Sequence, residues 1–290
     1  MRIVSWNLQW GRGADGRVDY ARTVAALRLL AADGATAPEV MCLQEVARNF
    51  DGLAGGSGED GVALLQAAFP GYEAVYGAAL DVARAGGGRA QFGNLILSRV
   101  PVLQAFRHLL PFPADPSVPG MPRGCVEVVL DAPGGPLRVL TTHLEYYSAL
   151  QRRAQVLALR RLQAEALSHA RLAGRMPERE SNPAFAPRPR PARALLCGDF
   201  NCEPGSVDHA AMVAREGFEG AGWNDAWRCA HGDRPHAPSV GLHGAEWPER
   251  AYCCDFFWVS DELTASVAAI EVDAATDASD HQPVVLDLAL

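Results

Sequence analysis

The sequence predicts a single α/β domain. Short runs rich in β-forming residues alternate with segments whose apolar residues recur at helical spacing, so both strands and helices are expected. The 290 residues, 49% of them hydrophobic and 21% charged, suffice for one large or two small domains. Because no internal repeat or break in composition divides the chain, we expect residues 1–290 to form one domain.

Composition also limits the class of protein. The first residues, MRIVSWNLQW, lack the features of a signal peptide, and no apolar stretch approaches the length of a membrane span, so a soluble, cytoplasmic protein is predicted. The 7 cysteines are odd in number and lack the spacing of a zinc site, so free and mostly buried thiols are expected. The net charge of -8 disfavours a protein whose main task is to grip long nucleic acid.

The first two predicted strands both end in polar residues. Residues 2–8 form an apolar, β-rich run that we interpret as a buried strand ending at Asn7. Residues 18–32 carry apolar residues at helical spacing and predict a helix. Residues 39–46 predict a second buried strand, which closes with Glu45. A lone Glu at such a place is more often a solvated strand end, but here it repeats the pattern of Asn7.

The middle of the chain predicts several strands and a glycine-rich loop. A short helix is expected at residues 62–69, and strands are expected at residues 73–76, 93–98, 102–108, 123–130 and 137–142. The loop at residues 81–91 holds Arg84 and Arg89, whose guanidinium groups could clamp a phosphate; the alternative is a flexible solvated loop. The strand at residues 137–142 is followed by His143, so a third polar side chain stands at a strand end.

The second half of the chain adds one long helix and two long irregular segments. A capping-box signature at Ser148 begins the helix. Residues 174–192 are rich in proline and arginine, and we expect them to form a mobile excursion whose arginines, Arg190 among them, are only solvated. Residues 228–251 form a loop that is too long to lack a role, and we interpret it, with His243 and Trp247, as part of the wall of a substrate site.

The stretch LLCGDFNCEPGS, residues 195–206, contains two candidate site residues close together. Its apolar residues predict a buried strand, and Asp199 and Asn201 follow at its exit. An acid and an amide are costly to bury without hydrogen bonds or a cation, and Mg²⁺ takes carboxylate, amide and water oxygens as ligands. For an isolated Asp-x-Asn pattern, the alternative is a turn in which both side chains satisfy local backbone groups.

The C-terminal part supplies further acids and a histidine. Asp255 lies within YCCDFFWVS, a β-rich run in which an inward-pointing carboxylate must be paired. Asp280 and His281 precede a final strand. Polar groups thus stand at or near the ends of separate predicted strands: Asn7, Glu45, His143, Asp199, Asn201, Asp280 and His281. Few purely structural proteins place so many polar groups there, so we interpret this set as one site.

These motifs also resemble a known family. SWN, LQE, THL, GDFN, the strand acid of CCDFFWVS and a terminal SDH occur in the order and rough spacing of the endonuclease/exonuclease/phosphatase superfamily, whose fold is that of pancreatic deoxyribonuclease. The resemblance spans Asn7 to His281, and GDFN and SDH are its specific elements. It implies a four-layer α/β sandwich, with two central, mostly antiparallel β-sheets, helices outside and an active site at one edge of the sheets. It also implies metal-dependent hydrolysis of a phosphoester.

The resemblance further implies a role for each site residue. Asn7, Glu45 and Asp280 resemble the ligands of Mg²⁺ (or Mn²⁺), and Asp199 and Asn201 resemble residues beside the metal and the attacking water. His143 is similar to the phosphate-binding histidine, and Asp255 to the acid that orients His281. The chain departs from the family pattern after the strand acid, where Phe256 and Phe257 replace the usual basic or aliphatic residue.

The residue types fit a hydrolytic mechanism. A cation held by Glu45 and Asn7 would neutralise the phosphate oxygens and polarise phosphorus. Water would then attack in line, and His281 or Asp199 would take its proton while His143 stabilises the developing charge.

The substrate class follows from the residues expected around the site. The candidate contacts Arg84, Arg89, Arg123, His243 and Trp247 suffice for one or two phosphates, so we expect a small or headgroup-like phosphoester. An endonuclease or exonuclease acting on DNA or RNA is the alternative. A non-catalytic binding module of the same fold is expected to have lost part of the polar set, and a zinc hydrolase would need a histidine cluster that the irregular spacing of residues 231, 236 and 243 does not suggest.

Overall fold

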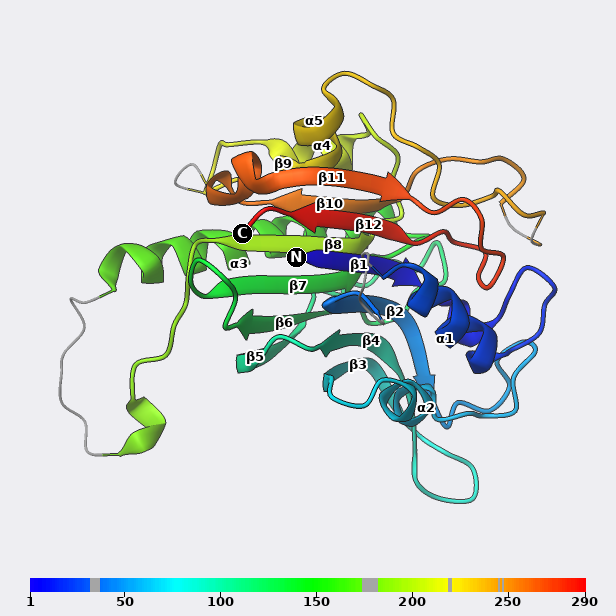
Figure 1. Ribbon diagram of the computed structural model, residues 1–290. Helices are drawn as coiled ribbons and strands as arrows, with labels where there is room; N and C mark the ends of the chain where they lie inside the picture. Colours follow the sequence, from blue (N-terminus) through cyan, green and yellow to red (C-terminus); the bar gives the residue numbers. More distant parts are fainter. Residues whose placement is uncertain (32–36, 174–181, 219–220, 245, 247) are drawn as a thin grey trace.

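Two six-stranded β-sheets lie face to face in the computed structural model, and helices cover their outer faces (Figure 1). The structure describes residues 1–31, 37–173, 182–218, 221–244, 246 and 248–290. The first sheet consists, in spatial order, of β11 (Val267–Val272), β12 (Val284–Leu288), β1 (Arg2–Asn7), β2 (Val40–Arg48), β4 (Arg89–Ser98) and β3 (Glu73–Ala83). The second consists of β5 (Val102–Leu109), β6 (Gly124–Leu130), β7 (Leu137–His143), β8 (Ala194–Asp199), β10 (Asp255–Val259) and β9 (Asn224–Asp225).

The helices of the described residues are mostly short, and each long one starts at a side-chain cap. The α-helices are α1 (Tyr20–Leu29), α2 (Gly61–Ala68), α3 (Ala149–Leu172), α4 (Val207–Val213) and α5 (Ala226–His231), and the 3₁₀-helices are η1 (Gln9–Gly11), η2 (Pro183–Phe185) and η3 (Asp261–Ser266). The predicted cap of α3 is confirmed, because the Ser148 hydroxyl accepts a hydrogen bond from the Gln151 N–H at 3.2 Å.

Three apolar layers hold this arrangement together. The facing sides of the two sheets form the central core, which includes Ile3 and Leu195. The outer face of the first sheet packs against Leu27 of α1, and the outer face of the second sheet brings Leu196 against Leu159 of α3. Leu195 and Leu196 belong to different layers because successive side chains of a strand point to opposite faces. The four-layer α/β sandwich that the resemblance implied is therefore the fold of the protein.

Parallel pairing at the centre of each sheet directs the ends of β1, β7 and β8 to the same edge of the sandwich. Most neighbouring strands are antiparallel, but β1 pairs with β2, and β7 with β8, in parallel. Parallel strands present their carboxyl ends at the same edge of a sheet. The register places Asn7 opposite Gln44 and His143 opposite Asp199. These ends lie on the right-hand side of Figure 1.

Two predicted segment boundaries are wrong in the first sheet. Strand β2 does not close with Glu45 but continues to Arg48. Strands β3 and β4 form a long hairpin that takes up most of the loop predicted at residues 81–91. Asp81 stabilises this hairpin across the strands, since it accepts hydrogen bonds from Arg89 Nε at 2.7 Å and Gln91 Nε2 at 3.0 Å. A hydrophobic pattern does not reveal such polar cross-strand pairs.

The segment predicted as an irregular loop at residues 228–251 is partly ordered by polar contacts. Helix α5 continues into it as far as His231. His236 Nε2 then lies 2.8 Å from Asp225 Oδ2, an oxygen that also lies 3.1 Å from His209 Nε2. These contacts hold the start of the segment against the second sheet.

The expected excursion at residues 174–192 falls partly outside the described residues, since residues 174–181 are not described. The described part runs outside the two sheets (Figure 1). Near its end, Arg190 forms an ion pair with the buried carboxylate of Glu127, and its guanidinium carbon lies 4.4 Å from the ring centroid of Phe106. This residue is therefore not merely solvated, and it ties the end of the segment to the second sheet.

The cysteines and helices agree with two further expectations. All 7 cysteines are free, and Cys229 alone among them is exposed. Within the described ranges, the helices lack the combination of length and apolar character that crossing a membrane requires.

Candidate active site

The predicted polar residues meet at the edge of the sandwich where β1, β7 and β8 end (Figure 1). We call them the edge cluster: Asn7, Glu45, His143, Asp199, Asn201, Asp255, Asp280 and His281. The side-chain amide of Asn7 links two of its acids, because Nδ2 lies 3.1 Å from Asp199 Oδ2 and 3.3 Å from Glu45 Oε1. Since Asn7 belongs to the first sheet and Asp199 to the second, the cluster bridges the two sheets.

A β-bulge directs Glu45 into the edge cluster. The register of β2 against β4 shifts between Leu43 and Val46, and Glu45 itself has a φ of 54°. Bulges of this kind re-aim a side chain and are frequent next to active sites. Burial, together with the nearby carboxylate of Asp280, raises the pKa of Glu45 to about 7.

Asp280 is held beside the first strand by the turn that precedes β12. Gln9 Nε2 donates a hydrogen bond to Asp280 Oδ2 at 2.8 Å. The Ser279 hydroxyl lies 2.8 Å from the carbonyl oxygen of Asn7 and accepts a hydrogen bond from the His281 N–H at 3.2 Å. Burial raises the pKa of Asp280.

Asp199 is the central acid of the cluster. Its Oδ1 accepts a hydrogen bond from the Asn201 N–H at 2.9 Å. Its Oδ2 lies 3.4 Å from His143 Nε2 and 3.7 Å from His281 Nε2. Burial raises the pKa of Asp199 to about 6, against the opposing effect of His281. One oxygen of this carboxylate is thus fixed by the backbone, and the other faces both histidines.

His281 and Asp255 form a buried hydrogen-bonded pair. His281 Nδ1 lies 2.9 Å from Asp255 Oδ2, and the Ser239 hydroxyl donates to the same oxygen at 2.6 Å. Burial disfavours the charged imidazole, but the carboxylates of Asp255 and Asp199 outweigh it and hold the pKa of His281 well above its usual value. The two carboxylates therefore favour the charged form of this imidazole.

The departure at Phe256 and Phe257 leaves this pair intact. Phe256 packs into the core beneath α3, and Phe257 packs into the central core. The two rings therefore point to opposite faces of β10, while Asp255 precedes them at the start of the strand.

His143 is neutral and its tautomer is fixed by Asn201. Asn201 Nδ2 lies 2.9 Å from the carbonyl oxygen of Leu144 and 3.0 Å from His143 Nε2. A carbonyl oxygen can only accept, so the amide nitrogen faces both partners and His143 Nε2 must accept as well. The proton therefore resides on Nδ1, which lies 3.6 Å from Glu45 Oε1. Burial lowers the pKa of His143 well below its usual value.

The donor set fits a hard divalent cation. Glu45, Asp199 and Asp280 are carboxylates whose pKa values are all raised, first of all by burial, so the surrounding groups do not fully compensate their negative charge. Carboxylate oxygens are the ligands that Mg²⁺ and Mn²⁺ prefer. Asn7 lies beside these acids with its Nδ2 facing Glu45 and Asp199, while its Oδ1 accepts a hydrogen bond from the Gln9 N–H at 3.0 Å.

Arg123 is the predicted substrate contact that lies beside the edge cluster. It borders a small cavity together with Glu45, His143 and Asn94. Its Nε donates a hydrogen bond to Glu145 Oε2 at 3.2 Å, which holds the guanidinium group in place.

The other two predicted arginines are engaged elsewhere. Arg84 Nε lies 2.6 Å from Asp51 Oδ2, and Arg89 Nε lies 2.7 Å from Asp81 Oδ1. Neither arginine borders the described cavities beside the edge cluster. Each guanidinium group of this hairpin thus has a carboxylate partner in the structure, and phosphate binding by these arginines stays a prediction.

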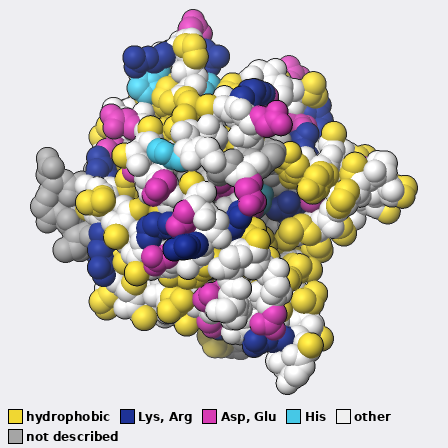
Figure 2. All heavy atoms as spheres, turned by 90° about the vertical axis from the view of Figure 1, so that its right-hand side faces the viewer, with side chains coloured by type: hydrophobic (Ala, Val, Ile, Leu, Met, Phe, Trp, Pro, Cys, Tyr) yellow, Lys and Arg dark blue, Asp and Glu magenta, His cyan; other side chains and the backbone are white. Residues whose placement is uncertain are grey.

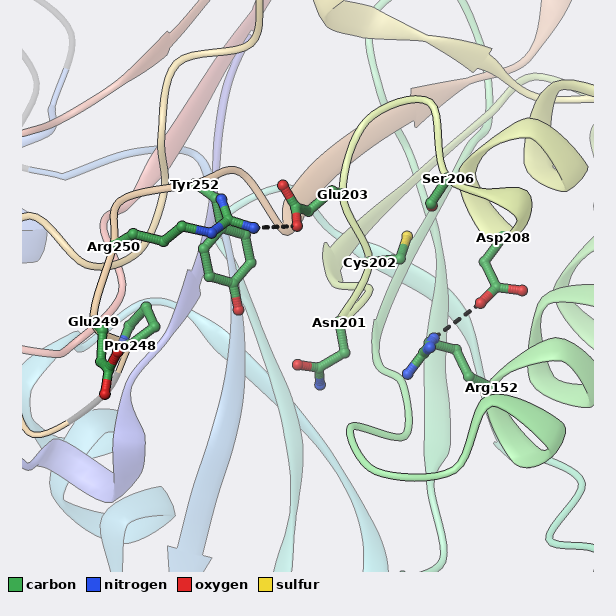
Figure 3. A pocket seen from close by; sticks show the side chains of 10 residues that line it. All are labelled: Arg152, Asn201, Cys202, Glu203, Ser206, Asp208, Pro248, Glu249, Arg250 and Tyr252. Atoms are coloured by element: carbon green, nitrogen blue, oxygen red, sulfur yellow. Dashed lines mark hydrogen bonds and ion pairs between the residues drawn. The ribbon is translucent and has the colours of Figure 1, made fainter.

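A larger cavity opens beside Asn201, and Figure 3 shows its lining residues. Its volume is about 760 Å³. Pro248, Glu249 and Arg250, near the end of the predicted substrate wall, line it together with Tyr252. His243 instead places its Nε2 2.9 Å from the carbonyl oxygen of Ala274, and Trp247 lies outside the described residues.

Three polar residues of the site are not predicted from the sequence. Gln9 contacts Asp280, Ser239 contacts Asp255, and Asn94 borders the small cavity. Gln9 and Asn94 carry a usable signal, since the first follows a buried strand and the second is an amide within an apolar strand. Ser239 carries none, because a serine in a long loop is ordinary.

Sequence and fold both relate this chain to known proteins. A profile of the Endonuclease/Exonuclease/phosphatase family matches residues 4–281. No curated protein matches the sequence significantly. Similar solved structures include an endonuclease/exonuclease/phosphatase from Bacteroides vulgatus, with 19% identity, a TM-score of 0.68 and coverage of 100% of this chain and 98% of that chain.

Two further structures with assigned activities share the fold. A mannosyl-6-phosphatase from Bacteroides thetaiotaomicron has 15% identity and a TM-score of 0.62, with 100% of both chains covered. A 3′ phosphatase from Neisseria, bound to a product DNA hairpin, has 18% identity and a TM-score of 0.60, again with 100% of both chains covered. At such identities the likeness concerns the fold alone, whereas the family profile spans every residue of the edge cluster. The chain belongs to the endonuclease/exonuclease/phosphatase family.

Proposed function

We propose that the protein is a phosphoester hydrolase that uses Mg²⁺ or Mn²⁺ and acts on a small or headgroup-like phosphoester. The observation that carries this proposal is the meeting of three carboxylates, two buried and Glu45 partly buried, with the two buried histidines His143 and His281. The two phosphatases that share the fold support the reaction class.

Asn7, Glu45 and Asp280 would hold the cation, with Asp199 beside it. When bound, such a cation neutralises the phosphate oxygens and makes phosphorus easier to attack. The hydrogen bonds from Asn7 and Gln9 to the cluster acids keep these carboxylates oriented.

Asp199 is suited to accept the proton of the attacking water. Its pKa of about 6 lies close to neutral pH, where a general base works best. The Asn201 N–H and the Asn7 side chain fix both of its oxygens. Because the carboxylates around His281 favour its charged form, we favour Asp199 over His281 as the base. Such help contributes about 10²–10⁴-fold to the rate.

The two histidines would stabilise the phosphate as negative charge develops. His281 is held by Asp255 through Nδ1, so its Nε2–H is directed to the space beside Asp199. His143 carries its proton on Nδ1, on the side of Glu45. Donors that are fixed in advance stabilise a transition state without reorganisation.

The charge distribution favours a compact substrate over a polymer. Acidic and basic side chains are interspersed on the face at which β1 and β8 end (Figure 2). A duplex nuclease is expected to present basic groups that follow several phosphates, whereas Arg84 and Arg89 are paired with acids.

A substrate panel tests the proposal. Purified protein with Mg²⁺ should hydrolyse p-nitrophenyl phosphate or its bis ester, and excess EDTA should abolish the activity. Full activity in EDTA would contradict the metal dependence. Efficient cleavage of plasmid DNA that falls steeply with salt, with a slope of about -0.9 per phosphate contact, would instead support a nuclease.

A further inference from the structure

The cavity beside Asn201 adjoins the edge cluster directly (Figure 3). Its volume of about 760 Å³ lies within the range of small-ligand pockets. Asn201 lines the cavity and also bonds His143 of the edge cluster at 3.0 Å. A group bonded to a phosphate at the edge cluster can therefore extend into this cavity.

Two ion pairs line the cavity, so each guanidinium group there already faces a carboxylate. Arg250 pairs with Glu203, and Arg152 Nε lies 2.9 Å from Asp208 Oδ2 (Figure 3). Arg152 also donates to the carbonyl oxygen of Glu145 at 3.0 Å. A second phosphate that entered the cavity would thus compete with Glu203 and Asp208 for these guanidinium groups.

The net charge of the lining also disfavours a polyanion. Among the described lining residues, the carboxylates are Glu203, Asp208 and Glu249, and the guanidinium groups are Arg152 and Arg250. The carboxylates are in excess, so the wall repels a chain of phosphates.

The lining suits hydroxyl groups better than a quaternary ammonium. A hydroxyl both donates and accepts, so neighbouring hydroxyls can bond a carboxylate and a guanidinium that lie side by side, as Glu203 and Arg250 do. A quaternary ammonium is typically bound by an aromatic cage. Tyr252 is the aromatic residue among the described lining residues, and the guanidinium carbon of Arg250 already lies 4.8 Å from its ring centroid.

We propose that this cavity is the leaving-group subsite and takes a neutral, polyhydroxylated group, so that the substrate is a phosphoester of a sugar or another polyol. The inference rests on the proposed function and adds the chemical class of the alcohol. Glu203 and Arg250 are then specificity residues that contact the hydroxyl groups, while the edge cluster acts on the phosphate.

Steady-state kinetics of the full chain with Mg²⁺ test this inference. The substrates are sn-glycerol 3-phosphate, D-glucose 6-phosphate and myo-inositol 1-phosphate, with phosphocholine and p-nitrophenyl phosphate for comparison. We expect kcat/KM for the best polyol phosphate to exceed that for phosphocholine by at least about 10-fold. In Glu203→Gln and in Arg250→Ala, the ratio of kcat/KM for the polyol phosphate to that for p-nitrophenyl phosphate should fall by about 10- to 100-fold.

Matched variants and substrates distinguish a failure of the proposed subsite from a failure of the proposed function. Arg228→Ala removes a different exposed ion pair, with Asp233, and should leave the ratio unchanged. The side chains of Arg250 and Glu203 are 62% and 49% exposed, so their variants should keep the thermal midpoint of the wild type. If p-nitrophenyl phosphate is hydrolysed but neither variant changes the ratio, or if phosphocholine is preferred, the subsite is overturned alone. If no phosphoester is hydrolysed, the proposed function fails and the subsite with it.

Discussion

Two clusters of charged residues in this sandwich shift the pKa of a carboxylate in opposite directions. In the second sheet, Glu127 accepts a hydrogen bond from Arg138 at 2.7 Å and also pairs with Arg190 and His108. Burial alone would raise its pKa, but His108 and Arg138 outweigh burial and lower the pKa of Glu127 to about 2. In the edge cluster, burial prevails and the pKa of Glu45 rises to about 7.

The difference separates a structural cluster from a functional one. The carboxylates of Glu127 and Glu45 are both largely removed from water, so burial does not distinguish them. They differ in the number of positively charged partners. A buried acid that is fully paired contributes to the fold, and losing its partner is costly. A group of buried acids that lacks sufficient partners is a candidate for binding a cation or for catalysis. Substitutions in each cluster test the two sides of this contrast.

The largest effect is expected at Asp199. Asp199→Asn should lower kcat/KM by about 10²–10⁴-fold, because it removes the proposed base while keeping the shape of the side chain. The thermal midpoint should stay equal or rise, since one of three crowded acids becomes neutral. Kinetics with p-nitrophenyl phosphate and thermal unfolding measure both quantities. A variant that merely unfolds would point to a structural role.

Glu127→Ala should act on stability instead. It leaves Arg138 buried without its main partner, so the free energy of unfolding should fall by about 3–5 kcal/mol while the folded enzyme keeps its kcat. Denaturant unfolding gives the first value. Glu165→Ala is the control, because it removes an exposed partner of Arg190 and should change stability little. If Glu127→Ala and Glu165→Ala lowered the free energy of unfolding equally, the contrast between the two clusters would be wrong.

Mg²⁺ should stabilise the protein through the edge cluster. At a concentration of 100 times Kd, a ligand that binds only the folded state adds about 2.7 kcal/mol to the free energy of unfolding. The corresponding rise in thermal midpoint should vanish in Asp280→Asn and persist in Glu127→Gln, provided that the latter folds. If Mg²⁺ raised the thermal midpoint of Asp280→Asn as much as that of the wild type, the cation would bind outside the edge cluster.

The two clusters should respond to pH with opposite signs. The folded pKa of Glu45, about 7, exceeds its ordinary value of 4.5, so the folded state binds more protons between these values. In EDTA, stability should therefore fall by about 2 kcal/mol as pH rises from 4.5 to 7, and Glu45→Gln should flatten this slope. Glu127 has a depressed pKa, so its contribution is lost as pH falls from 4.5 towards 2. Denaturant unfolding at several pH values measures both.

The smallest effects are expected on the hairpin of β3 and β4. Arg84→Ala and Arg89→Ala should each change kcat/KM by less than about 2-fold, because each arginine is held in an exposed ion pair worth about 0–1 kcal/mol. A loss of more than about 10-fold in either variant would show that the substrate reaches this hairpin, and would favour the nuclease alternative.

The pattern of polar residues at strand ends is sufficient to locate much of the edge cluster. Asn7, His143 and Asp199 follow buried strands, and a polar residue at such a place is visible in the sequence itself. The same pattern locates Glu45, although β2 continues beyond it. The β-bulge turns the Glu45 side chain toward the edge cluster, so this residue occupies a position like that of a residue at a strand end. The resemblance adds the sandwich and the residue roles, which periodicity alone does not contain.

Contacts between residues far apart in the sequence explain two features that the sequence does not reveal. Arg84 is predicted to bind phosphate, yet its partner Asp51 precedes it by 33 residues. Arg190 is expected to be solvated, yet it pairs with Glu127, which lies 63 residues away. A charged side chain looks free in a sequence until the fold supplies its partner.

From the pairing of β1 with β12, we expect the edge cluster to form late in folding. Arg2 lies opposite Asp287, and Gln9 and Asp280 meet across a separation of 271 residues. Contacts of such long range require most of the chain entropy to be lost first, so they form late. A chain that has formed the second sheet and α3, but has not yet docked β12, lacks both Asp280 and His281 at the edge. A divalent cation that binds only the assembled cluster should therefore slow unfolding and leave the folding rate unchanged.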